Sequence, residues 1–196
     1  MTEALKNLGL QVGHRGVGRL MRQNGISVIR TRKHKVTIDS NHKFNIAPNF
    51  LDRDFTADRP NQKWAVCISY IGTCEGWLYL AAVLDLHSRR GVGWAISNRM
   101  KRDLAIRALD TAVTLQKPLK GCIHHSDRGS QYCSHEYQAR LRKNGFEFSM
   151  PGKCNCYDNA AMETLFKTIK AEFIWKHTWH TRRQAELAIF EYINGF

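Results

Sequence analysis

The stretch Trp64-Ala65-Val66-Cys67-Ile68-Ser69-Tyr70-Ile71 is followed by a turn at 72–76 and a continuous apolar run at 77–84. Runs of this length, rich in β-branched and aromatic residues and bounded by glycines, are typical of buried β-strands. A third strand is expected at 91–96, after a polar turn. Because tight turns join these segments, they predict an antiparallel meander.

Helical and strand patterns alternate after this meander. Apolar residues recur at helical spacing over 102–116, and Ser134 and Gly145 are suited to cap another helix at its two ends. The other expected elements are strands at 121–124 and 146–150, a helix from Asp158 to Phe173, and a last helix opened by the capping-box pattern Thr181-x-x-Gln184. This order predicts an α/β fold with a mixed five-stranded sheet and flanking helices, in which parallel strands are joined by right-handed crossovers.

Residues 1–60 differ in pattern from residues 61–196, so we expect a small helical segment with a basic linker ahead of the sheet domain. Val17, Leu20 and Met21 give short apolar periodicity, and Gly25 is suited to end a helix. The basic residues of this segment fall in two groups, which are Arg15, Arg19 and Arg22 at helical spacing and then Arg32, Lys33 and Lys35. The first group would share a helix face suited to phosphate contact, and a solvated surface stripe would have the same spacing.

The charge balance favours a polyanionic partner. The 196 residues contain 30 Lys and Arg against 17 Asp and Glu, a net charge of +13. Nucleic acid is the leading partner class, whereas no basic amphipathic helix favours a membrane. No signal peptide is apparent and the longest apolar run is too short to span a bilayer, so we expect a cytoplasmic protein with reduced cysteines. Their spacing does not fit a structural zinc site.

Two carboxylates carry the candidate chemistry. Asp127 follows the strand expected at 121–124, and Glu163 lies on the helix that begins near Asp158. Carboxylates converging on two Mg2+ ions roughly 3.5–4 Å apart are the chemistry of phosphodiester cleavage. Lys167 and Lys170 follow Glu163 on the same helix face and are suited to hold a nucleic-acid backbone. Taken singly, Asp127 fits a turn residue and Glu163 a solvated helix residue paired with Lys167.

From about residue 8 onward the chain resembles the second-frame transposase of IS3-type insertion sequences. The matching strings include Asn61-Gln62-x-Trp64, Gly76-Trp77-Leu78-Tyr79-Leu80, Asp85-Leu86-x-Ser88-Arg89, 125–132 and Asn155-Cys156-Tyr157-Asp158-Asn159-Ala160-x-x-Glu163. The resemblance implies a retroviral-integrase-like, ribonuclease-H-like core with a DDE triad that uses Mg2+ or Mn2+. It also implies a helix-turn-helix-like DNA-binding segment within 1–60 and a homo-oligomer on double-stranded DNA, both the element ends and the target. Lysines placed like Lys167 and Lys170 touch the DNA end in the similar integrases.

The chain departs from this family at the first triad position. Where the family has Trp-x-x-Asp, this sequence has Trp64-Ala65-Val66-Cys67. A thiol is a soft ligand, whereas Mg2+ prefers hard oxygen ligands, so we expect weakened metal binding and impaired strand transfer. Asp85, the nearest remaining upstream acid, does not match the triad position. Cys154 stands at a position where the family has Gly, and the match stops at the C-terminus where the family continues, so the core is expected to be truncated there.

Two functions remain open at this stage. The first is a transposase of bacterial cytoplasm and nucleoid, with Asp127 and Glu163 as remaining metal ligands and Cys67 at the position of the missing Asp. The second is a non-catalytic DNA-binding remnant of such an enzyme. A nuclease acting on RNA–DNA hybrids would fit the core but not the transposase strings.

Overall fold

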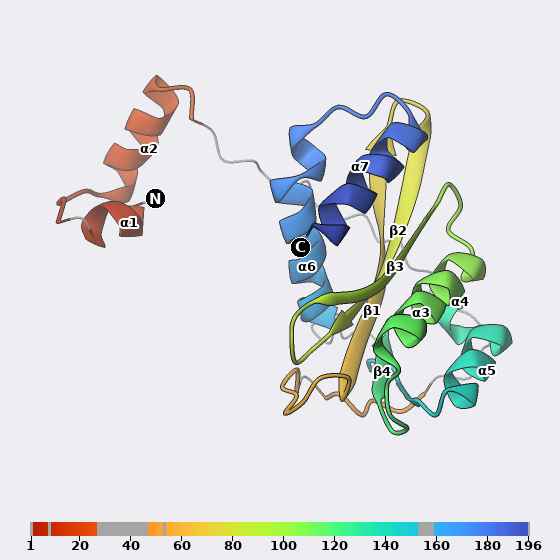
Figure 1. The fold of residues 1–196 in the computed structure, drawn as a ribbon. Helices are drawn as coiled ribbons and strands as arrows, with labels where there is room; N and C mark the ends of the chain where they lie inside the picture. The colour runs from red at the N-terminus through yellow and green to blue at the C-terminus, as the bar shows by residue number, and fades with distance from the viewer. Residues whose placement is uncertain (1, 8, 27–46, 53, 153–158, 196) are drawn as a thin grey trace. The chain divides into compact units, whose positions relative to one another are not determined.

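The computed structural model describes residues 2–7, 9–26, 47–52, 54–152 and 159–195. Contacts between Cα atoms divide the chain into two units, Met1–Thr37 and Ile38–Phe196 (Figure 1), which are treated separately below. The predicted DNA-binding residues Arg32, Lys33 and Lys35 lie outside the described residues, as do Cys154 and Asp158.

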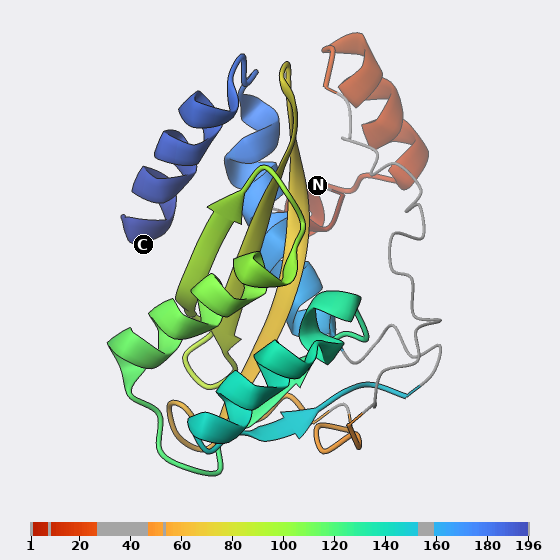
Figure 2. The ribbon, with the colours of Figure 1, turned by 90° about the vertical axis from the view of Figure 1, so that its right-hand side faces the viewer.

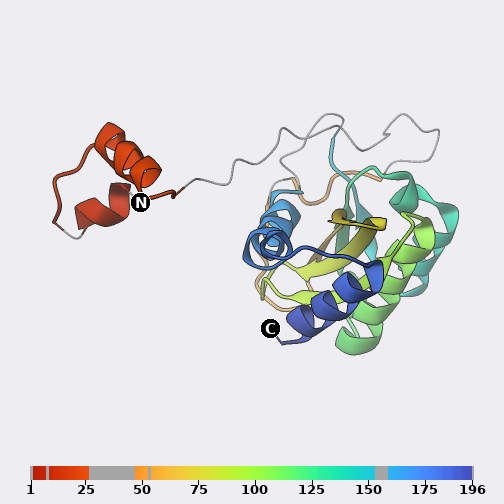
Figure 3. The same ribbon diagram turned by 90° about the horizontal axis from the view of Figure 1, so that it is seen from above.

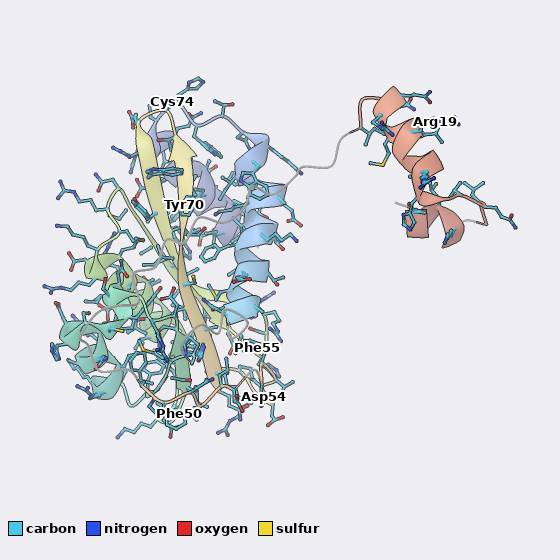
Figure 4. The ribbon with its side chains drawn as sticks, turned by 180° about the vertical axis from the view of Figure 1, so that it is seen from behind. Arg19, Phe50, Asp54, Phe55, Tyr70 and Cys74 are labelled. Carbon is cyan, nitrogen blue, oxygen red and sulfur yellow. The ribbon has the colours of Figure 1, made fainter. Side chains whose placement is uncertain are left out.

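The N-terminal unit contains helices α1 (Thr2–Asn7) and α2 (His14–Gln23). Val17 of α2 is buried, whereas Leu20 is 51% exposed, so only the first of the expected apolar positions is a core residue. Asn24 caps α2 and Gly25 follows with φ of 66°, which confirms the helix stop expected there. Arg15, Arg19 and Arg22 are all exposed along α2, and Figure 4 shows the place of Arg19 on this helix.

The second unit is built on a mixed five-stranded sheet, as the sequence predicts. Its strands are β1 (Lys63–Thr73), β2 (Gly76–Asp85), β3 (Gly91–Ser97), β4 (Ile123–Ser126) and β5 (Glu147–Ser149), in the order β3-β2-β1-β4-β5. The pairs β1–β2 and β2–β3 are antiparallel, which confirms the meander, and β1–β4 and β4–β5 are parallel. β4 begins two residues later than expected, because Gly121 adopts φ of 89° in a turn and the ladder with β1 starts only at Ile123.

Helices cover both faces of this sheet. They are α3 (Arg102–Gln116), α4 (Ser130–Cys133), α5 (His135–Lys143), α6 (Ala160–Glu172), the 3-10 helix η2 (Ile174–Lys176) and α7 (Arg182–Asn194). Figures 1, 2 and 3 show α3 and α5 on one side of the sheet and α6 and α7 on the other. An apolar cluster lies between the sheet and the helices on each side. The cluster on the α3 and α5 side includes Leu109 and Leu141, and the cluster on the α6 and α7 side includes Met162 and Ile189.

Local capping sets the helix boundaries largely as predicted. The Ser134 hydroxyl accepts a hydrogen bond from the Tyr137 amide, and Thr181 accepts one from the Gln184 amide at 3.0 Å. Gly145 follows α5 with φ of 73°, where its lack of a side chain is required. No helix within the described residues is both long and apolar enough to cross a membrane.

The segment 47–52 packs against the sheet unit. Met150 donates its amide to the Pro48 carbonyl at 3.2 Å, and the Phe50 amide donates to the Ser149 hydroxyl at 2.9 Å. Leu51 is buried in the α6–α7 side of the core. These contacts fix the segment beside β5, and the functional boundary near residue 60 stays a prediction.

His124 is a buried, uncharged residue in the middle of β4. Its side chain is fully buried, and its Nε2 lies 2.9 Å from the Tyr137 hydroxyl. The Phe146 ring packs at 5.8 Å between centroids. Burial lowers the pKa of His124 from 6.5 to about 3, because an imidazolium there would lose its hydration.

This burial predicts a pH-dependent stability. Since the folded pKa lies below the unfolded value, the contribution of His124 is complete above pH 6.5 and is lost as the pH falls towards 3. Between pH 7 and pH 5 we expect His124 to account for about 2 kcal/mol of lost unfolding free energy. Urea denaturation of the paired variant His124→Phe, Tyr137→Phe should show a loss smaller by that amount, whereas the exposed His180→Gln should behave like the unchanged protein. An unchanged pH slope in the paired variant would refute the assignment.

Candidate active site

The sheet register brings Cys67 and Asp127 together. β1 and β4 run parallel, and their last paired residues are Val66 and Ser126. Cys67 and Asp127 each follow by one residue, so they are neighbours at the end of this ladder, on strands about 4.8 Å apart. β4 ends at Ser126, which confirms the sequence-based placement of Asp127 just beyond a strand.

Glu163 approaches the same point from α6. Ala65 and Cys67 both face the cluster beneath α6 and α7, whereas Val66 faces the opposite cluster. Met162 anchors the first turns of α6 in that cluster and leaves Glu163 exposed at its flank. The negative charges of Asp127 and Glu163 both act on the Cys67 thiol. The three positions predicted as catalytic therefore lie in one electrostatic neighbourhood.

The Cys67 thiol is held in its protonated form. Burial is the main cause, and the charges of Asp127 and Glu163 add to it, so that the pKa of the thiol rises from 9.0 to about 12. Hydrogen bonds with the Ile68 carbonyl and the Asn159 side chain oppose this rise only in part. A protonated thiol is neither a nucleophile nor a metal ligand at neutral pH.

Asp127 is oriented by its own turn. The Gly129 amide donates to Asp127 Oδ1 at 2.8 Å, which fixes the carboxylate at the start of α4. A Cβ at position 129 would lie only 2.9 Å from that oxygen, so a side chain there would displace the Asp127 carboxylate from this position. Burial raises the pKa of Asp127, and the Gly129 hydrogen bond opposes the rise. Asp127 is thus both a turn residue and a member of the site.

The two lysines extend the site along α6. Lys167 is exposed, while Lys170 is half-buried and places its Nζ 4.7 Å from the centre of the Tyr70 ring. Seven helical residues rise about 10.5 Å, and three strand residues rise about 10 Å. The part of α6 from Glu163 to Lys170 therefore lies alongside the part of β1 from Cys67 to Tyr70. Burial lowers the pKa of Lys170.

The remaining predicted residues and alternatives lie elsewhere. Asp85 is 1% exposed, and its carboxylate accepts hydrogen bonds from the amides of Asn61 and Ser88 and from the Ser88 hydroxyl. These bonds close the turn after β2, opposite Trp64 rather than Cys67, so Asp85 does not take the place of the missing carboxylate. Arg15, Arg19 and Arg22 belong to the separate N-terminal unit.

Sequence reasoning gave no role to Asn159. This residue precedes Glu163 by one helical turn, and its side chain acts on the Cys67 thiol. Its Oδ1 is buried without a hydrogen-bond partner among the described residues. The Asp158-Asn159 string that carries part of the family resemblance is the sequence signal for this residue.

The residues present do not fit a two-metal centre. Across the described ranges, no group of three or more His, Cys, Asp and Glu side chains is placed to share a cation. Asp127 and Glu163 supply hard oxygen ligands. The third position, Cys67, offers only a protonated thiol. A bridging carboxylate is absent from the site as described.

Comparison with solved structures identifies the fold class of the sheet unit. The fold matches retroviral integrases, including the simian T-cell lymphotropic virus intasome in complex with PP2A regulatory subunit B56 gamma, with a TM-score of 0.57 and 15% identity over 97% of this chain and 67% of that chain. The HTLV-2 integrase catalytic core domain, solved with magnesium in a trimeric form, matches with a TM-score of 0.50 and 18% identity over 59% of this chain and 71% of that one. The ribonuclease-H-like fold of integrase cores is therefore established.

Sequence comparison narrows the class to a family. The integrase core domain family matches residues 57–156, and a second integrase core domain model matches 163–196. The chain is 40% identical over 195 residues to an insertion element IS600 31 kDa protein of Shigella sonnei, covering all of this chain and 71% of that protein. It is 39% identical over 193 residues to the transposase InsF of IS3A from Escherichia coli K12, covering 98% and 67% respectively. The chain belongs to the IS3-type transposases with an integrase core domain.

The protonated state of Cys67 can be tested by alkylation. Because only about one thiol in ten thousand is ionised four pH units below its pKa, we expect Cys67 to react with iodoacetamide at pH 8 at least about a hundredfold more slowly than Cys74. Cys74 is exposed at the β1–β2 turn and serves as the internal control. Peptide mass spectrometry over time measures both rates. Similar rates would show an accessible thiolate at position 67.

Proposed function

We propose that this protein acts in the transposition of an insertion sequence by binding DNA, with its cleavage and strand-transfer step impaired. DNA cleavage and strand transfer by two-metal phosphoryl transfer are the ancestral activity implied by its family. Cys67 carries the proposal, because it follows the last β1–β4 pair and lies beside Asp127 and Glu163, where a bridging carboxylate would stand. The favoured function is therefore DNA occupation without efficient chemistry.

Charge and side-chain placement support DNA as the partner. The net charge of +13 favours a polyanion. Lys167 and Lys170 continue from Glu163 along α6, and three arginines line α2 in the other unit. Phosphate contacts of this kind position a duplex without specifying its sequence. Element ends and target DNA are the double-stranded partners that such contacts would hold.

The family context supports assembly and location. The simian T-cell lymphotropic virus neighbour was solved as an intasome. Joining two element ends requires two DNA-bound copies to meet, so we propose that this chain also forms a homo-oligomer on DNA. Its relatives come from Shigella and Escherichia coli, which favours action on the bacterial nucleoid.

Restoring a carboxylate at position 67 tests the impairment. Cys67→Asp adds a third negative charge beside Asp127 and Glu163, so we expect a lower Tm without divalent cation. At Mg2+ or Mn2+ concentrations of a hundred times Kd, its Tm should rise by about 5 °C or more. Nicking of supercoiled plasmid DNA should appear with the variant and be absent with the unchanged protein.

Cys67→Asn is the matched control, because it has the size of Asp without the charge. It should show neither the metal-dependent Tm shift nor plasmid nicking. Equal nicking by the unchanged protein and Cys67→Asp would contradict the impairment. A metal-dependent Tm shift of the unchanged protein would show that the thiol site holds the cation after all.

DNA binding through phosphate contacts makes the binding constant depend on the salt concentration. Replacing Arg15, Arg19 and Arg22 with Gln should weaken duplex binding and reduce the slope of log K against log salt by about 3, if each contacts one phosphate. Fluorescence anisotropy over a salt series measures the slope. The control variant replaces the exposed Lys117, Lys120 and Lys143 with Gln, which removes the same charge from a part of the sheet unit away from Cys67. Equal slopes for the two triple variants would show general charge attraction rather than a binding face on α2.

A further inference from the structure

The end of the β1–β2 hairpin carries two exposed aromatic side chains. Tyr70 is 39% exposed and Trp77 is 53% exposed, and their rings meet edge to face with centroids 5.0 Å apart. Figure 4 shows Tyr70 and Cys74 on the part of the hairpin that extends beyond α3 and α5. An adjacent pair of exposed aromatic rings is an unusual surface feature and indicates a binding site.

Topology leaves this aromatic surface, formed by Tyr70 and Trp77, without a cover. β1 pairs with β4 only from Lys63 to Val66, whereas its pairing with β2 continues to Thr73. Beyond Val66, β1 has an open edge within the part of the chain that the structure describes. Tyr70 shares its face of the strand with Val66 and Ile68, which pack against the α3 cluster, but the cluster does not extend to Tyr70.

The ammonium group of Lys170 contacts the aromatic surface from the other side of the sheet. Lys170 projects from α6, which packs on the opposite face, and its Nζ reaches the Tyr70 ring across the open edge of β1. An ammonium over an aromatic ring is attracted by the ring quadrupole. Lys170 also places a positive charge beside the aromatic surface, where it can contact the phosphates of a nucleic-acid strand.

The hairpin end is held in place before any ligand arrives. The Arg182 amide donates to Glu75 Oε2 at 2.8 Å, and Arg182 Nε donates to the Trp77 carbonyl at 3.2 Å. The Cys74 amide donates to the Trp179 carbonyl at 2.9 Å. These bonds tie the turn to the start of α7, so the aromatic surface is presented on a rigid support and loses little entropy on binding.

We propose that Tyr70 and Trp77, with Lys170, bind unpaired bases of a DNA strand whose backbone follows α6 from Glu163. The inference rests on the proposed function, because it names the form of DNA that the site would hold. Every base has a π-face, and aromatic rings beside a positively charged groove are the common device for binding single strands. The aromatic surface lies about 10 Å along β1 from Cys67, so a strand held at Glu163 can reach it.

The test compares two DNA duplexes of equal length with the full chain. One is fully paired, and in the other the last three base pairs are mismatched so that the strands separate. We expect tighter binding to the mismatched duplex. Trp77→Ala and Tyr70→Ala should each reduce this preference by about fivefold or more, whereas Tyr70→Phe should retain it.

Trp175→Ala is the matched control, because Trp175 is 46% exposed on η2 and is not a member of the Tyr70–Trp77 ring pair. It should leave the preference unchanged. Each variant's affinity for the fully paired duplex reports whether the protein is still folded and binds DNA.

The outcomes separate this inference from the proposed function. Equal binding of the unchanged protein to both duplexes would overturn the inference and leave the proposed function standing. Absence of salt-dependent binding to either duplex would overturn both. If Trp77→Ala changes the mass in sedimentation but not the DNA preference, the aromatic surface is a protein interface and the inference is wrong.

Discussion

The arrangement of the sheet unit depends on the two different pairings of β1. This strand forms an antiparallel ladder with β2 along its whole length and a parallel ladder with β4 over its first four residues only. The point where the parallel ladder stops creates both features discussed above. It places Asp127 beside Cys67, one residue beyond the last paired row. Among the described residues, it also leaves the rest of β1, which includes Tyr70, with an open edge. Backbone pairing, more than side-chain attraction, therefore sets the position of the site.

This origin explains how the site keeps its shape with a thiol at position 67. The two buried residues that precede Cys67, Ala65 and Val66, pack into different apolar clusters. The Asp127 turn is closed by the Gly129 amide and needs no partner from β1. None of these interactions uses the side chain at position 67, so a substitution there changes the chemistry without removing the support of the fold. In this architecture the side chain at position 67 can change without loss of the surrounding structure.

Much of the fold could be predicted because local signals agreed with the tertiary structure. The meander, the caps at Ser134 and Thr181, and the placement of Asp127 each rest on patterns within a few residues. The register of β4 could not be predicted, because it begins where the ladder with β1 starts rather than where apolar residues begin. The contact of Lys170 with Tyr70 was also inaccessible, since it joins side chains a hundred residues apart across a strand edge. Proximity of Cys67 to the two acids followed from family resemblance, whereas the protonation of its thiol needed the burial and charges of the folded site.

The substitution at Cys67 also changes the electrostatic balance of the protein without metal. Three carboxylates at one ladder end repel one another unless a cation lies between them, and burial of Asp127 increases the cost of its charge. A protonated thiol removes one of the three charges and so relieves that repulsion. Active sites commonly carry such strain as the cost of function. Under the proposed function, the chain binds DNA without cutting it and has no need of the third charge, because the proposed phosphate contacts use arginines and lysines and not acids. Under the proposed function, Cys67 exchanges metal affinity for stability in the absence of metal and leaves the fold intact.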